Sequence, residues 1–198
     1  MPALISVYQG FSIALDFSGD FQWSPTVLFW KNINPYIHYL SGNKDGAIIL
    51  WQAPNYAHLT YLIFAPFAFF EWQIVQPLWA IINILLGILC VFIICRQAKL
   101  SILDNYIVLV IFLSCTPFRN VVGNGNHSII ILLLYCGLFI KNDRWSSVLI
   151  GFSFFKYSFL FPIAFFIFLK KGVNSFLLCL IPCGAGWIIF SLVLSKSF

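Results

Sequence analysis

The strongest constraint on this chain is a succession of apolar runs, several close to the length that crosses a membrane. The runs cover about residues 1–15, 58–71, 75–95, 102–118, 127–140, 146–169 and 174–195. A helix needs roughly 20 apolar residues to span a hydrocarbon core about 30 Å thick, whereas a lipid-spanning barrel would show short alternating segments. We therefore predict an all-α fold, a polytopic transmembrane bundle of about six or seven membrane segments.

The composition agrees with a membrane protein and excludes several function classes. Of the 198 residues 61% are hydrophobic and only 9% are charged, which is outside the range of soluble domains. The net charge of +5 is spread thinly between the apolar runs, which suits anionic lipid headgroups and not nucleic acid. The six cysteines lie in or beside apolar runs without a CxxC pair, so we predict no metal and no cofactor.

The start of the chain favours a membrane helix over a cleaved signal peptide. The stretch "MPALISVYQGFSIAL" has no basic region before its apolar part, as a signal peptide would. At about 15 residues it is short for a span, which a truncated or misassigned start would explain.

One extended polar region, residues 16–57, is too polar to span and is predicted to be an ordered external loop. Within it, "PTVLFW" and "GAIILW" have aromatic residues at their ends, a pattern typical of helices that lie in the membrane interface. No repeat or linker divides the chain, so we predict a single membrane domain over residues 1–198.

Two membrane layouts fit the sequence. If every apolar run spans and the long loop is outside, the basic turns "RQAK" (96–99) and "KNDR" (141–144) also lie outside, against the positive-inside tendency. If the run 58–71, which contains Pro66, only dips into the membrane, both turns move inside and "FRNVVGNGNH" joins the loop outside.

Two charged residues need a reason. Lys156 lies about ten residues into the apolar run 146–169, where a charge costs roughly 2.5 to 3.5 kcal/mol. It either reaches the interface along its stem or pairs with a carboxylate such as Asp104, or it binds an anionic ligand. Asp20, in the loop motif "SGDFQW", is either a solvated turn residue or a catalytic carboxylate.

A dense polar motif, "FRNVVGNGNHSII", separates two apolar runs. It supplies Arg119, Asn126 and His127 beside glycines that let the backbone approach a ligand; the alternative is a Gly-Asn turn before a helix. An external acid, membrane cations and aromatic residues together suit a reaction between a lipid-phosphate donor and a polar acceptor. The carboxylate would accept the acceptor's proton while a cation holds the phosphate that leaves.

The order of these pieces resembles the integral-membrane glycosyltransferases of fold type C, in particular the polyprenyl-phosphate-mannose-dependent α-mannosyltransferases. The resemblance spans residues 19–162 and rests on five short motifs that each match weakly. In chain order, the matching residues are Gly19-Asp20-Phe21 together with Asn34-Pro35-Tyr36 in the loop, then Tyr56 with Pro66, Trp79 with Asn83, Gly125-Asn126, and Gly151 with Lys156 and Pro162.

The resemblance implies an inverting transfer of a hexose, with mannose expected, from a polyprenyl-phosphate sugar to a lipid or glycan acceptor. Asp20 would be the general base and Lys156 would lie at the donor phosphate, with Arg119, Asn126 and His127 as further substrate contacts. It implies no metal and no cofactor. The site would lie on the outer face of a multi-pass membrane protein, in the plasma or inner membrane if the source is bacterial.

The chain also departs from the family pattern, which leaves other functions open. Family members are about twice this length, a proline is usual near His58, and the proline expected directly after Lys156 is missing. The alternatives are a truncated non-catalytic remnant, a small membrane subunit, or a transporter in which Lys156 binds an anionic substrate. A transporter would show an inverted repeat, and the sequence has no convincing second copy.

Overall fold

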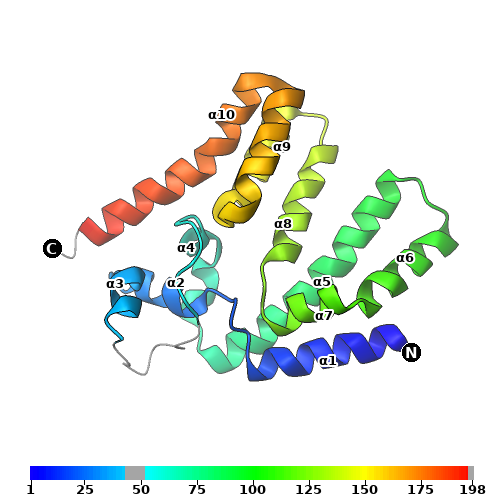
Figure 1. The fold of residues 1–198 in the computed structure, drawn as a ribbon, viewed down its shortest axis with the longest axis horizontal. Helices are drawn as coiled ribbons and strands as arrows, with labels where there is room; N and C mark the ends of the chain where they lie inside the picture. Colours follow the sequence, from blue (N-terminus) through cyan, green and yellow to red (C-terminus); the bar gives the residue numbers. More distant parts are fainter. Residues whose placement is uncertain (43–51, 196–198) are drawn as a thin grey trace. The chain divides into compact units, whose positions relative to one another are not determined.

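The computed structural model describes residues 1–42 and 52–195, and every element in them is a helix (Figure 1). The chain divides into two compact units, and each is described by itself. Unit 1 comprises Met1–Phe21 and Glu71–Phe139, and unit 2 comprises Gln22–Phe70 and Ile140–Phe198. The all-α fold is confirmed, and the single domain over residues 1–198 stays a prediction.

The number of membrane segments is smaller than the sequence predicts. In the described residues, two helices are long and apolar enough to span, α5 (Trp72–Gln97) and α10 (Leu160–Leu194). A third span is formed if α6 (Ile102–Ser114) and α7 (Thr116–Gly123), bent by 57° at Cys115, count as one. The described residues therefore support two or three membrane segments, and the prediction of six or seven finds no support in them.

Short helices account for the difference. The run 58–71 folds as α4 (Thr60–Ile63) and the 3-10 helix η1 (Ala65–Phe69). The run 127–140 folds as α8 (Ser128–Tyr135) and η2 (Cys136–Phe139). Neither approaches the roughly 20 residues of a span. The bend lies at Cys115, which is extended with ψ 144°, and Pro117 just after it has no N–H to continue the hydrogen bonds of α6.

Unit 1 is assembled around α1 (Pro2–Asp16), which packs closely on α7. The buried face of α1 consists of Ser6, Gly10 and Ala14, small residues at a spacing of four that let two helices approach. A Cβ atom at Gly10 would lie 3.2 Å from the Arg119 carbonyl oxygen. One at Gly123 would lie 2.8 Å from the Ile13 side chain. Both glycines therefore set the distance between α1 and α7.

The end of α1 lies beside the start of α5, as Figure 1 shows. Buried Gln76, in the second turn of α5, donates to the Ala14 carbonyl oxygen at 2.7 Å. The far end of α5 bears Arg96, with Lys99 just beyond it. A helix of this length extends about 39 Å, so the polar start of α5 and its basic end are a membrane thickness apart.

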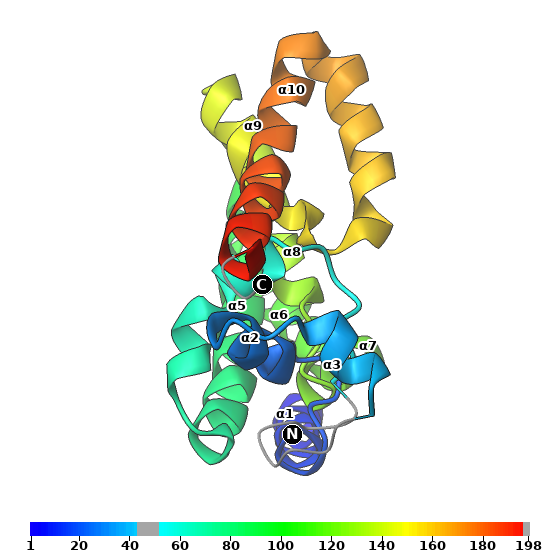
Figure 2. The same ribbon diagram turned by 90° about the vertical axis from the view of Figure 1, so that its left-hand side faces the viewer.

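Unit 2 contains a helical hairpin within α10 and the shorter helix α9 (Asp143–Phe152), which packs against it (Figure 2). Gly172 has φ 79° and ψ 179°, a backbone conformation that glycine adopts without strain. The chain reverses there, so α10 consists of two limbs. A Cβ atom at Gly151 of α9 would collide with the Cys179 carbonyl of the second limb.

The predicted interfacial helix is present but packs inside unit 2. The stretch "PTVLFW" belongs to α2 (Trp23–Trp30), of which residues 24–29 are buried. A second loop helix, α3 (Pro35–Leu40), begins where the Asn34 side chain accepts from the Tyr36 and Ile37 amides, which is a helix N-cap. The other predicted interfacial helix, "GAIILW", lies outside the described residues.

Candidate functional site

Asp20 and Asn126, 106 residues apart in sequence, meet in unit 1. The Asn126 side-chain amide donates to the Asp20 carboxylate at 2.6 Å, and the Asp20 backbone N–H donates to the Asn124 carbonyl at 2.8 Å. The Asn126 side-chain oxygen Oδ1 accepts from the Ser128 hydroxyl at 2.6 Å and from the Ser128 backbone N–H at 3.0 Å. Because Ser128 occupies the oxygen of this amide, the NH₂ group is directed at Asp20.

The backbone around Gly125 makes this meeting geometrically possible. Gly125 has φ 67°, and its missing side chain leaves room for the neighbouring chain, since a Cβ there would lie 3.0 Å from that of Phe21. Its carbonyl oxygen accepts from the Trp79 indole at 2.9 Å. A substitution at Gly125 would therefore strain the turn and crowd the segment that bears Asp20.

Aromatic rings pack around Phe21, the residue that follows Asp20. Phe21 stacks on Trp79 with ring centroids 4.7 Å apart and an interplanar angle of 7°. The His127 ring lies 5.5 Å from Trp79 and 6.1 Å from Phe21, and its side chain is fully buried. His127 thus packs within this aromatic group next to Asn126, while Asp20 is partly exposed. A role of His127 in substrate binding stays a prediction.

Arg119 lies elsewhere in unit 1, on the face of α7 that meets α1. Its guanidinium donates to the Gln9 side-chain oxygen at 2.8 Å. The two residues line a groove of about 400 Å³ together with Tyr8, Ser12, Ile13 and Asn120. Asp20 and Asn126 are not in its lining, and a shared substrate site of Arg119 with these two residues stays a prediction.

Lys156 lies in unit 2. The apolar run 146–169, which was predicted to be one membrane segment, is broken around this residue. The helix α9 ends at Phe152, and two 3-10 turns, η3 (Ser153–Phe155) and η4 (Tyr157–Phe159), precede α10. Lys156 joins them in an extended conformation, with φ −100° and ψ 94°. The run looks continuous in the sequence because hydrophobic composition does not show where the backbone leaves the helical conformation.

The partners of the broken segment come from the loop before α4. The Lys156 ammonium lies 5.6 Å from the centroid of the Tyr56 ring, close enough for a cation–π contact. The Ala57 N–H donates to the Phe155 carbonyl oxygen at 2.8 Å.

Asp104, the carboxylate named above as an alternative partner of Lys156, lies in unit 1. It accepts from the Ser101 hydroxyl at 2.6 Å at the start of α6. A shared site of Asp20 and Lys156 stays a prediction, because they belong to different units.

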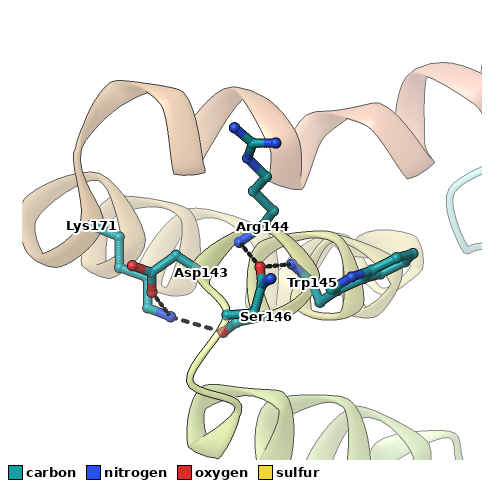
Figure 3. A network of polar contacts seen from close by, with 6 residues as sticks. Asp143, Arg144, Trp145, Ser146 and Lys171 are labelled. Carbon is teal, nitrogen blue, oxygen red and sulfur yellow. Dashed lines mark hydrogen bonds and ion pairs between the residues drawn. The ribbon is translucent and has the colours of Figure 1, made fainter.

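A polar network that the sequence did not predict lies at the start of α9 in unit 2 (Figure 3). Lys171 donates to the Asp143 carboxylate at 2.9 Å and to the Ser146 hydroxyl at 2.8 Å. The Asn142 side chain caps the helix by accepting from the Arg144 and Trp145 amides. Asn142 followed by Asp143 is a helix-start signal, but the contact with Lys171 depends on the chain reversal at Gly172.

In the described residues there is no group of three or more His, Cys, Asp or Glu side chains that could hold a metal ion. The family comparison supports another chemistry. The model of glycosyltransferase family 87 matches residues 56–197, which include Arg119, Asn126, His127 and Lys156 but not Asp20. No curated protein and no solved structure matches the chain. With most of its length matched and two or three spanning helices, this integral membrane protein belongs to glycosyltransferase family 87.

Proposed function

We propose that the protein transfers a hexose, with mannose as the first sugar to test, from a polyprenyl-phosphate sugar to a lipid or glycan hydroxyl. The observation that supports this best is the Asp20 carboxylate, held at 2.6 Å by the Asn126 amide. Asn126 lies within the family match, although Asp20 precedes it. A partly exposed carboxylate held by a neutral donor keeps an oxygen for a substrate proton.

In the proposed reaction Asp20 acts as the general base. The Asp20 oxygen not bonded to Asn126 takes the proton of the acceptor hydroxyl, whose oxygen attacks C1 of the sugar. The bond between C1 and the phosphate oxygen breaks as the new glycosidic bond forms, which inverts C1. The polyprenyl phosphate leaves with the bonding electron pair, and no metal is needed if a protein cation stabilises its charge.

Lys156 is the proposed contact for that phosphate. Its segment is a break between helical turns, and irregular backbone at membrane depth is tolerated where it is buried in protein or lines a cavity. Broken helices are also places where membrane proteins bind charged ligands. A lysine ammonium supplies a compact charge there, with three donors for phosphate oxygens.

The outer face of the membrane is the proposed location of Asp20. Phe21, next to Asp20, packs against Trp72 and Trp79 near the start of α5, whereas Arg96 and Lys99 follow at its other end. Basic turns favour the cytoplasmic side, so the end with Asp20 would face outward. The short run 58–71 supports the same layout, because α4 and η1 are too short to span.

The test is sugar transfer by the purified protein in lipid nanodiscs, with a polyprenyl-phosphate mannose and a membrane lipid extract as acceptor. We expect polyprenyl phosphate to be released together with a glycosylated product, and we expect both to depend on Asp20. Asp16→Asn is the matched control, because Asp16 is an exposed carboxylate at the end of α1.

Two results would contradict the proposal in different ways. Full activity of Asp20→Asn would remove Asp20 as the base while leaving a transferase. A folded wild-type protein that transfers no hexose from any polyprenyl-phosphate donor would favour a non-catalytic membrane subunit.

A further inference from the structure

The groove between α1 and α7 contains the Arg119 guanidinium, and no carboxylate of the described residues pairs with it. Arg119 is partly buried, and its hydrogen-bond partner is the neutral Gln9 amide at 2.8 Å. Across residues 1–42 and 52–195, the structure gives Arg119 no carboxylate partner. The groove lining contains no acidic residue either, so the site is positively charged.

The packing of unit 1 keeps Arg119 in this position. Gly10 and Gly123 allow α1 and α7 to touch, with the Arg119 backbone itself against Gly10. The groove therefore belongs to the rigid contact between two helices. Hydroxyl and amide groups of Tyr8, Ser12 and Asn120 complete its polar wall, and each can donate a hydrogen bond.

The surface next to the groove is apolar and exposed. Leu4 and Ile5, one turn before Tyr8 on α1, are 75% and 53% exposed. Large exposed aliphatic side chains on a membrane protein are suited to acyl chains. A groove that contains a cation and hydroxyl groups and continues into an exposed apolar surface has the two parts of an amphiphile's binding site.

We propose that this groove binds the phosphate headgroup of a bilayer glycerophospholipid. Arginine presents a planar fork of donors that matches two phosphate oxygens, and the groove volume of about 400 Å³ accommodates a headgroup. The acyl chains would lie along Leu4 and Ile5. The lipid would neutralise Arg119, bridge α1 and α7, and stabilise the unit that positions Asp20.

This assignment is independent of the proposed transferase reaction. Glycerophospholipids are the predominant phosphates of a bilayer, and the groove is open to its surroundings at Tyr8, Ser12 and Asn120, which are exposed. Neither Asp20 nor Asn126 lines it. A failed transfer assay would therefore leave the lipid site standing, and loss of the lipid site would leave Asp20 as the candidate base.

The test is native mass spectrometry of the full chain titrated with phosphatidylglycerol, together with its thermal transition in detergent. We expect the wild type to retain one phosphatidylglycerol molecule and to be stabilised by it. Arg119→Gln should weaken retention about tenfold or more, and Arg144→Gln, at an exposed arginine of unit 2, should not.

A second variant separates lipid binding from folding. Gln9→Glu places a carboxylate at the position that now accepts from Arg119, so the protein itself neutralises the guanidinium. This variant should fold, should lose phosphatidylglycerol as Arg119→Gln does, and should no longer be stabilised by the lipid.

Three outcomes would overturn the assignment. Unchanged retention in both variants would show that Arg119 does not hold the lipid. Equal retention of phosphatidylglycerol and of the uncharged lipid monoolein would show that the phosphate is not recognised. Displacement of phosphatidylglycerol by a tenfold lower concentration of a short isoprenyl phosphate would assign the groove to a polyprenyl-phosphate donor instead.

Discussion

Asp20 in unit 1 and Asp143 in unit 2 are two carboxylates held in different ways. Asp143 accepts from the Lys171 ammonium at 2.9 Å, whereas Asp20 accepts from the Asn126 amide at 2.6 Å. For the part of the chain that the structure describes, Asp20 has no cationic partner. The lysine ammonium attracts its carboxylate through a full charge, whereas the asparagine amide orients its carboxylate by a hydrogen bond between a neutral donor and the anion. The pair with lysine therefore suits a structural link, and the pair with asparagine suits a base.

The largest expected effect distinguishes the two carboxylates directly. Asp20→Asn should lower kcat by about 10² to 10⁴, the range that general base catalysis contributes. Asp143→Asn should leave kcat within about twofold, because it removes only an exposed ion pair. Polyprenyl phosphate release by purified variants, with folding followed by circular dichroism, measures both. Equal losses in the two variants would erase the distinction.

A substitution at Asn126 changes the charge at its hydrogen bond with Asp20. Asn126→Asp places a second carboxylate beside Asp20, and the like charge raises the pKa of the pair. The base is then protonated at higher pH, so the acidic limb of the kcat/KM profile should move upward. Asn142→Asp is the control, because aspartate can still cap α9 and the profile should not move. An unshifted profile for Asn126→Asp would argue against Asp20 as the titrating base.

The ion pair of unit 2 should contribute to stability and not to activity. Lys171→Met removes the contacts to Asp143 and Ser146, and we expect a loss of about 1 kcal/mol in unfolding free energy. The loss is small because Asp143 is 66% exposed and its attraction is screened by water. Lys170→Met, at the neighbouring exposed lysine, is the control in a denaturation experiment. A kcat loss above about tenfold in a stably folded Lys171→Met would assign this lysine a function.

The smallest expected effect tests whether pH acts on unit 2 independently of Asp20. The His58 ring stacks on the Phe190 ring with their centroids 3.7 Å apart, and burial lowers the pKa of His58. The unfolded chain then binds the proton more readily. The contribution of neutral His58 to the free energy of unfolding is fully present above the pKa of the unfolded chain, about 6.5. It is lost as pH falls through the lowered pKa of His58 in the folded protein. His58→Phe keeps the stack and should make the thermal midpoint less dependent on pH between about 5 and 7.

The all-α fold and a helix at "PTVLFW" in the loop 16–57 could be predicted from the sequence, whereas the number of membrane-spanning helices could not. Hydropathy finds apolar runs but not where a helix ends, and the runs 58–71 and 127–140 each divide into a short α-helix and a 3-10 helix. The break at Lys156 was missed for a related reason, since phenylalanines on both sides make the sequence look continuous. The resemblance singled out Asp20 and Asn126 separately, as a base and as a substrate contact, and did not predict the hydrogen bond between them. Its geometry depends on Gly125 and Ser128, whose roles appear once α7 and α8 are placed.

The reversal at Gly172 has a consequence for hydration. The first limb of α10 runs from Leu160 to the reversal and is about 18 Å long, little more than half the thickness of a hydrocarbon core. With the lysines of the reversal at one membrane surface, the turns around Lys156 would end near the middle of the bilayer. Uncoiled peptide groups at that depth need water or protein. The Ala57 N–H, which donates to the Phe155 carbonyl oxygen at 2.8 Å, meets part of that need without water.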